Sequence, residues 1–202
     1  MPDDTWPDTI WPDAAARLLI DRHPLAWLVS RRFNASPLPL LAKCDEQGQL
    51  VALFGHCARS NALLDDFADD PRGLVLFNGP AGYISPRYVS RTDWAPTWNF
   101  AALRIEVDVE LVPAETADAI ERLLDHLEGP LPARWSTAQL GARHDQLLAR
   151  VVAFRAHVRR FDPRFKLGQD ESEAEFRDIC ARSPDPQLVE WMQAFARGEL
   201  PD

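Results

Sequence analysis

The sequence has little cysteine and histidine, and this scarcity argues against disulfide and metal chemistry. It contains only Cys44, Cys57 and Cys180, with no CxxC pair, and its five histidines show no HExxH spacing. A disulfide framework needs more cysteines, and a structural zinc site needs ligands at short, regular spacing. We therefore expect reduced, structural thiols and no metal site.

Long apolar runs and an excess of basic residues are also missing. No run of about 18 apolar residues indicates a membrane span. The first residues, MPDDTWPDTIWPD, are acidic and broken by proline, unlike a secretory signal. The 22 basic against 31 acidic side chains give a net charge of −9, whereas nucleic-acid-binding proteins concentrate basic residues. These features predict a cytoplasmic protein without a membrane partner, and the charge does not support DNA as a partner.

Motifs of hydrolytic enzymes are absent as well. There is no GxSxG, and His56 and Cys57 are adjacent, so that in a strand their side chains point to opposite faces. No acid, base or nucleophile can be assigned. The catalytic residues are therefore unknown, and the sequence leaves open whether the protein is an enzyme.

Periodicity predicts most of the secondary structure. Apolar runs or strict alternation predict strands at 25–31, 36–43, 50–56, 73–79, 105–112 and 151–161. Helical spacing with capping signals predicts helices at 13–24, 59–71, 114–128, 171–182 and 186–198, and a capping box at 136–139 predicts a further short helix.

The last two strands carry opposite charges on their polar faces. Glu106, Asp108 and Glu110 alternate along one strand, and Arg155, His157 and Arg159 alternate along the other. If the strands pair, these side chains attract one another across the sheet, and the basic face is then structural. A solvated face is the alternative.

This order of elements predicts an α+β domain built on an antiparallel barrel or strongly twisted sheet. The helices do not alternate regularly with the strands, and no GxGxxG follows a strand, so a doubly wound parallel fold is disfavoured. We expect one domain over 1–202, with an N-terminal arm and helix at 1–24 and C-terminal helices at 170–202 packed on it.

Four segments combine polar, basic and aromatic side chains in a way that suits a ligand. GHCARSN (55–61) follows a strand with groups that can bind an anion, and FKLGQD (165–170) supplies a lysine and an amide. APTWNFA (95–101) offers an indole between two hydrogen-bonding side chains, and FNGPAGYISPRY (77–88) concentrates rings, glycines and prolines. Taken singly, each segment is equally compatible with surface charge or aromatic core.

Together with PLPLL (37–41), these motifs, in this order, resemble the PaiB-type family of FMN-binding negative transcriptional regulators. The resemblance spans roughly residues 11 to 180. It implies an FMN-binding split β-barrel of the flavin-reductase and pyridoxamine-phosphate-oxidase type, with inserted and C-terminal helices. It also implies a homodimer with FMN in clefts between the subunits, so that the partner and the flavin would cover the rings of 77–99.

The resemblance also implies the cofactor-binding residues. Arg59, Ser60 and Asn61 would surround the FMN phosphate, and Lys166 and Gln169 would come from the last strand. The remaining candidates, near the flavin ring or ribityl chain, are Thr97, Trp98 and Asn99, followed in second rank by Tyr83 and Ser85.

Several positions depart from the family pattern and mark a divergent member. The family commonly has HLPLL where this chain has SPLPLL, so the expected His is Ser36 or absent, and Ala62 replaces the Pro of ARANP. Gly168 and Asp170 replace the Ser and Asn of KLSQN, which removes a hydroxyl and adds a negative charge. These changes predict FMN binding that is weakened or lost.

Three functions follow from the resemblance and its departures. The first is an FMN-binding regulator of transcription, although only the family name points to DNA. The second is a flavin-dependent oxidoreductase acting on a small molecule. The third is a cofactor-free split-barrel dimer with an interaction or small-ligand role.

Overall fold

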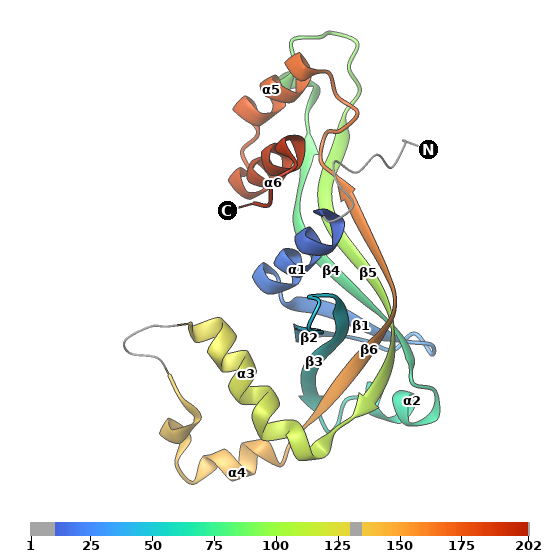
Figure 1. The fold of residues 1–202 in the computed structure, drawn as a ribbon, viewed down its shortest axis with the longest axis vertical. Helices are drawn as coiled ribbons and strands as arrows, with labels where there is room; N and C mark the ends of the chain where they lie inside the picture. Colours follow the sequence, from blue (N-terminus) through green and yellow to red (C-terminus); the bar gives the residue numbers. More distant parts are fainter. Residues whose placement is uncertain (1–10, 130–134, 202) are drawn as a thin grey trace. The chain divides into compact units, whose positions relative to one another are not determined.

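The computed structural model describes residues 11–129 and 135–201 (Figure 1). Residues 1–10 of the predicted N-terminal arm lie outside this part of the chain. Helix α1 (Trp11–Arg22) follows directly and confirms the predicted first helix.

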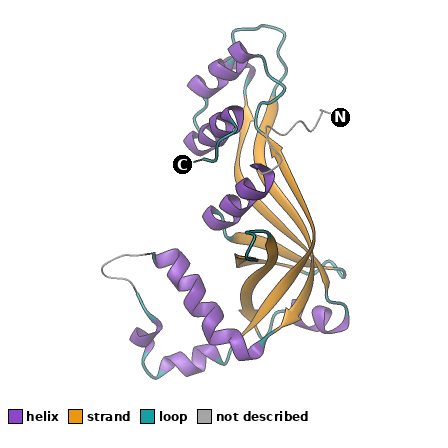
Figure 2. Ribbon diagram, viewed as in Figure 1, coloured by secondary structure: helices purple, strands orange, loops and turns teal. Residues whose placement is uncertain are grey.

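Six strands form a closed antiparallel barrel in the order β1-β2-β3-β6-β5-β4, which confirms the predicted fold class. The strands are drawn in orange in Figure 2. All six predicted strands exist. They are β1 (Leu25–Ser30), β2 (Ala35–Cys44), β3 (Leu50–Ala58), β4 (Arg72–Ile84), β5 (Thr97–Leu111) and β6 (Val151–Lys166).

Strand β4 is longer than predicted, because the GPAGYI segment continues the strand up to Ile84. Its glycines allow close packing there. A Cβ at Gly79 would lie 3.1 Å from Leu19 Cδ1 of α1, and one at Gly82 would lie 2.9 Å from Leu188 Cδ2. Glycine is thus required here by packing of helices against the strand, and not by a turn.

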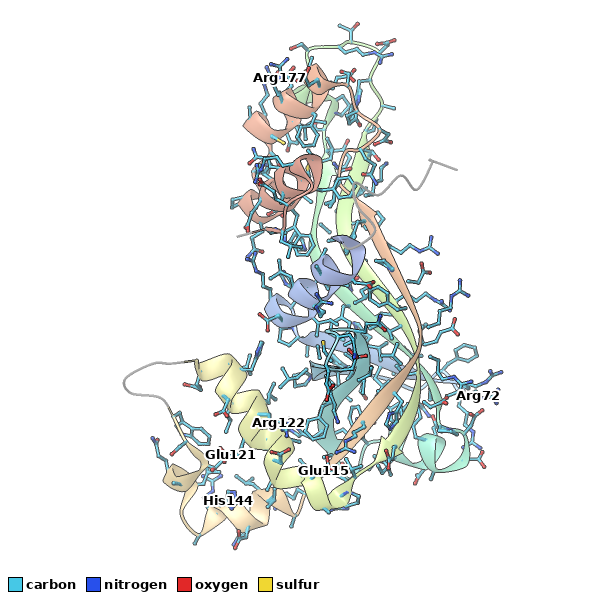
Figure 3. The ribbon with its side chains drawn as sticks, viewed as in Figure 1. Arg72, Glu115, Glu121, Arg122, His144 and Arg177 are labelled. Atoms are coloured by element: carbon cyan, nitrogen blue, oxygen red, sulfur yellow. The ribbon has the colours of Figure 1, made fainter. Side chains whose placement is uncertain are left out.

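The predicted helices are also present, with one correction. They are α2 (Leu63–Asp69), α3 (Thr116–Glu128), α5 (Glu173–Arg182) and α6 (Pro186–Arg197), joined by an unpredicted α4 (Arg143–Leu148). Thr137–Leu140 form the predicted short helix, as a 3-10 helix. The predicted capping box is wrong, because Ser136 makes no capping bond and the Thr137 hydroxyl donates to Glu121 of α3 (labelled in Figure 3). No helix in the described ranges is long and apolar enough to cross a membrane.

The chain folds as two compact units. Unit 1 consists of residues 11–22, 78–103 and 162–201, and unit 2 of residues 23–77 and 104–161, as far as the structure describes them. Both units contain fully buried apolar side chains. They include Leu19, Ile20, Ile84, Leu103 and Trp191 in unit 1, and Leu28, Leu40, Leu53, Phe77 and Phe154 in unit 2.

The predicted attraction between the last two strands is confirmed within unit 2. Arg159 Nη1 lies 2.6 Å from Asp108 Oδ2, and His157 Nε2 lies 2.8 Å from Glu110 Oε2. The bond to His157 lowers the pKa of Glu110. These basic side chains therefore hold two strands together at an exposed surface.

Asp66 of α2 ties the β1–β2 hairpin to the helix. Its carboxylate is buried and accepts hydrogen bonds from Ser30 Oγ at 2.5 Å, Asn34 Nδ2 at 2.8 Å and Arg32 Nη1 at 3.4 Å. The bonds from Ser30 and Asn34 lower the pKa of Asp66 below its ordinary value of 3.8. A buried carboxylate with several donors stabilises the fold only while it is ionised.

We expect Asp66→Asn to lower the melting temperature by roughly 5 °C at neutral pH. Because the folded-state pKa of Asp66 lies below the unfolded value, its stabilising effect is complete above about pH 4 and is lost as pH falls through the folded pKa. The difference in melting temperature between wild type and variant should therefore shrink on acidification. Thermal melts between pH 3 and pH 7 measure it.

The matched control is Asp65→Asn, which removes an exposed carboxylate from the same helix turn. It should change the melting temperature little at any pH. A difference between wild type and Asp66→Asn that does not depend on pH would contradict the assigned role of the charge.

Candidate functional site

Arg59 and Ser60, two of the three residues predicted to bind the FMN phosphate, are exposed in unit 2, immediately after β3. The backbone N–H of Arg59 donates to Arg150 O at 2.8 Å, and its Nε donates to Ala149 O at 3.1 Å. These bonds fix the start of the side chain while its terminal nitrogens can still donate to an anion. Ser60 follows, also exposed, with a hydroxyl that can donate.

Asn61 is held by internal hydrogen bonds. Its Nδ2 donates to Ser36 Oγ at 3.0 Å, and its Oδ1 accepts the backbone N–H of Leu63, the first residue of α2, at 3.0 Å. Asn61 of GHCARSN thus contacts Ser36, the residue directly before PLPLL. Its contribution to this site is to position the Arg59–Ser60 segment.

His56 and Cys57 form no dyad, as their adjacency in β3 predicted. Burial lowers the pKa of His56 and raises the pKa of the Cys57 thiol to about 11. Both groups are therefore neutral near pH 7 and unsuited to nucleophilic catalysis.

In unit 1 the TWN motif is divided between two faces of β5. Thr97 and Asn99 point to one face, and Trp98 points to the other. Asn99 is 1% exposed; its Nδ2 lies 3.5 Å from Met192 Sδ, and its Oδ1 has no partner among the described residues. Lys166 Nζ donates to Thr97 Oγ1 at 2.6 Å, so the lysine adjoins the Asn99 face.

Gln169 closes a turn at the end of β6. Its Oε1 accepts the backbone N–H of Leu167 at 2.7 Å, and its Nε2 donates to Phe165 O at 2.8 Å. Gly168 in this turn has φ +86°. The family-like KLGQD segment therefore has a structural role of its own in this chain.

Tyr83 and Trp98 form an exposed aromatic pair on unit 1. Their ring centroids lie 6.0 Å apart at 62°, and the residues are 48% and 58% exposed. Ser85 starts the next turn by accepting the backbone N–H of Arg87 at 3.2 Å. In contrast, Trp94 Nε1 donates to Glu171 Oε2 at 2.8 Å, so part of the aromatic loop lies against the chain itself.

The ten predicted residues therefore fall into separate groups. Arg59, Ser60 and Asn61 lie in unit 2, and the others lie in unit 1, where Thr97 meets Lys166 and Tyr83 meets Trp98. No group of three His, Cys, Asp or Glu side chains suited to a metal ion occurs in the described ranges. No motif in the sequence indicates an arginine-lined cleft in unit 2, because its residues come from four separate strands and the β1–β2 loop.

The closed six-stranded antiparallel barrel with inserted and C-terminal helices is the split β-barrel fold. The family model described as "Putative FMN-binding domain" matches residues 11–160, and the chain belongs to this family. The predicted membership is thereby confirmed.

The comparisons with individual proteins agree with this assignment. "Protease synthase and sporulation protein PAI 2" of Bacillus subtilis (strain 168) is 27% identical over 130 residues, which cover 63% of this chain and 62% of that protein, slightly less than two thirds of its length. The flavocytochrome Anf3 of Azotobacter vinelandii is 14% identical, with a TM-score of 0.58 over 88% of this chain and 74% of that chain. The FAD and heme binding protein of Mycobacterium smegmatis is 19% identical, with a TM-score of 0.58 over 83% and 77%. At these identities the two structures show the fold.

FMN is the cofactor that the family supports, and the donors of unit 2 fit its phosphate. A phosphate requires a cation and further hydrogen-bond donors, which Arg59 and Ser60 present on an exposed turn. When bound, the flavin supplies the redox chemistry, and the protein supplies binding and orientation.

Proposed function

We propose that this chain is an FMN-binding regulatory protein that holds the flavin phosphate through Arg59 and Ser60. The observation that carries the proposal is the anchored, outward-facing guanidinium directly after β3 in a chain of the FMN-binding family. Asn61 supports this turn through Ser36 and α2. The regulatory part of the proposal rests on the similarity to the Bacillus "Protease synthase and sporulation protein PAI 2" and on the resemblance of the motifs to the PaiB-type regulators.

We further propose that the protein works as a homodimer in which the Tyr83–Trp98 pair meets the second copy. Large exposed aromatic side chains are enriched at protein interfaces, because they bury much apolar area with few rotatable bonds. Sedimentation velocity at micromolar concentration tests this assignment. A monomer under these conditions would contradict it.

The proposal gives a supporting role to most other candidates in unit 1. Lys166 is bonded to Thr97, Gln169 closes its own turn, and Asn99 is covered by Met192. We assign these side chains to the stability and shape of unit 1. Ser85 likewise holds the turn after β4.

Arg59→Ala is expected to weaken FMN binding by about 10- to 100-fold, because a charge-assisted contact to phosphate is lost. Quenching of flavin fluorescence during titration measures the dissociation constant. Arg177→Ala, which removes an exposed arginine from α5 of unit 1, is the matched control and should bind FMN like wild type. Wild-type protein that retains no FMN would refute the proposed function. An Arg59→Ala variant with unchanged affinity for FMN would show that the flavin phosphate binds at another place.

We propose that the protein regulates by binding a ligand or another protein, and not by binding DNA directly. Its net charge of −9 disfavours contact with the phosphate backbone of DNA. Gel shifts with genomic fragments at physiological salt test this step. A sequence-selective shift that weakens as salt rises would overturn it.

A further inference from the structure

Unit 2 contains an open cleft of about 510 Å³ across the outer surface of β1, β4, β5 and β6. Small-molecule sites commonly have volumes of about 300–1,000 Å³. The lining differs from the predicted flavin residues. It includes the arginines Arg31, Arg72, Arg104 and Arg159, the aromatic Phe33, and the carboxylates Glu106 and Asp108.

Phe33 is held in this cleft in an unfavourable conformation. It is 88% exposed and has φ 65°, the only positive φ at a non-glycine residue in the described ranges. Its backbone N–H donates to Ser30 O at 3.0 Å, and Ser30 N donates to Asn34 O at 2.9 Å, which closes a three-residue hairpin loop. Glycine normally occupies the left-handed position of such a loop. A solvent-facing ring at a cleft, carried by a residue whose backbone is held in an unfavourable conformation, points to a functional role for the ring.

The arginines of the cleft are arranged by acidic neighbours. Arg104 Nη2 lies 2.8 Å from Glu106 Oε1, Arg159 pairs with Asp108, and Arg72 (labelled in Figure 3) forms bonds of 2.8 and 2.6 Å to Asp70. Each guanidinium has five N–H donors, so these pairs fix its direction and leave donors for another acceptor. Asp70 also lies 3.7 Å from Arg31, so the four arginines of the lining meet three carboxylates, which leaves an excess of one positive charge.

We propose that this cleft binds a nucleoside phosphate other than FMN, with its base against the Phe33 ring and its phosphates at the arginines. The exposed ring offers a stacking surface for a planar base, and guanidinium groups bind phosphate through paired N–H donors. A free nucleotide is favoured over a nucleic-acid strand, because the cleft is small and the chain as a whole is acidic. The site is separate from Arg59 and Ser60, which do not line it.

Isothermal titration of the full chain with ADP tests the proposal, with adenosine and pyrophosphate as partial ligands. We expect ADP to bind more tightly than either, since only ADP has both a base and a diphosphate. Arg104→Ala should weaken ADP binding about tenfold or more, through loss of a charged donor. Phe33→Gly should weaken it about fivefold or more, through loss of stacking, while relieving the strained backbone.

Arg177→Ala, in α5 of unit 1, is the matched control and should leave ADP binding unchanged. Arg159→Ala provides a second cleft variant if Arg104→Ala is poorly folded.

The proposal is overturned if wild type does not bind ADP, if pyrophosphate binds as tightly as ADP, or if a single-stranded oligonucleotide binds more tightly. Loss of FMN binding in Arg104→Ala would also overturn it, because the cleft would then hold the flavin. Loss of ADP binding with normal FMN binding supports it independently of the Arg59 test.

Discussion

Replacing Gly168 with serine, the residue common in the family, is expected to destabilise the protein by roughly 2–4 kcal/mol and not to tighten FMN binding. Gly168 has φ +86°, and a Cβ there would lie 3.1 Å from Met192 Cε and 3.2 Å from Phe176 Cδ2. A serine would therefore be strained by its backbone and crowded by its neighbours. The sequence suggested that this glycine marks a lost phosphate donor, but packing in unit 1 explains it directly.

Urea denaturation and flavin titration of the same sample measure both parts of this expectation. Asp170→Asn is the matched control, because it restores the other family residue at an exposed position of the same turn. It should leave the free energy of unfolding nearly unchanged. A Gly168→Ser variant with wild-type stability and tighter FMN binding would show that the glycine does reflect loss of the cofactor.

The strands could be predicted because burial on one side of a barrel leaves a period-two pattern in the sequence. β5 shows this most clearly: Ile105, Val107 and Val109 are buried, while Glu106 and Asp108 between them are not. The pairing of charges between β5 and β6 could be predicted for the same reason, since opposite charges alternated on the polar faces of both strands.

The errors occurred where tertiary contacts override local rules. Residues 80–84 have the composition of a loop, yet they belong to β4, where Gly82 lets a helix approach the strand closely. The STAQ sequence has the pattern of a capping box, yet Ser136 makes no capping bond, and Thr137 donates to a glutamate from another helix. Neither contact can be read from neighbouring residues.

The candidate site shows the same limit. The motifs correctly indicated an exposed Arg59 after a strand, because a single turn carries that information. They could not show that the Asn61 side chain is hydrogen-bonded to Ser36 and to the Leu63 backbone, since Ser36 lies on another strand. The arginine cleft was not predicted, because its lining residues lie far apart in the sequence and form no recognisable motif. Only the folded sheet brings them together.

Trp191→Ala is expected to lower the free energy of unfolding by about 3–5 kcal/mol, the largest loss among the variants considered. Trp191 of α6 is 1% exposed, and its ring centroid lies 5.9 Å from that of Phe165 at the end of β6. Removing the indole leaves a large cavity between this helix and the strand. Because well-packed interiors relax only partly around such a cavity, most of the lost contact energy is not recovered.

Urea denaturation measured by far-UV circular dichroism tests this expectation, with Gln187→Ala as the matched control on the exposed first turn of α6. Trp191→Phe should lie between the two, since it retains an aromatic ring against Phe165 but fills less volume. The order of the three free energies of unfolding therefore distinguishes the effect of the cavity from a general effect of substituting a residue in α6. A loss below about 1 kcal/mol for Trp191→Ala would be incompatible with a buried indole and would mean that α6 does not pack on the strand as described.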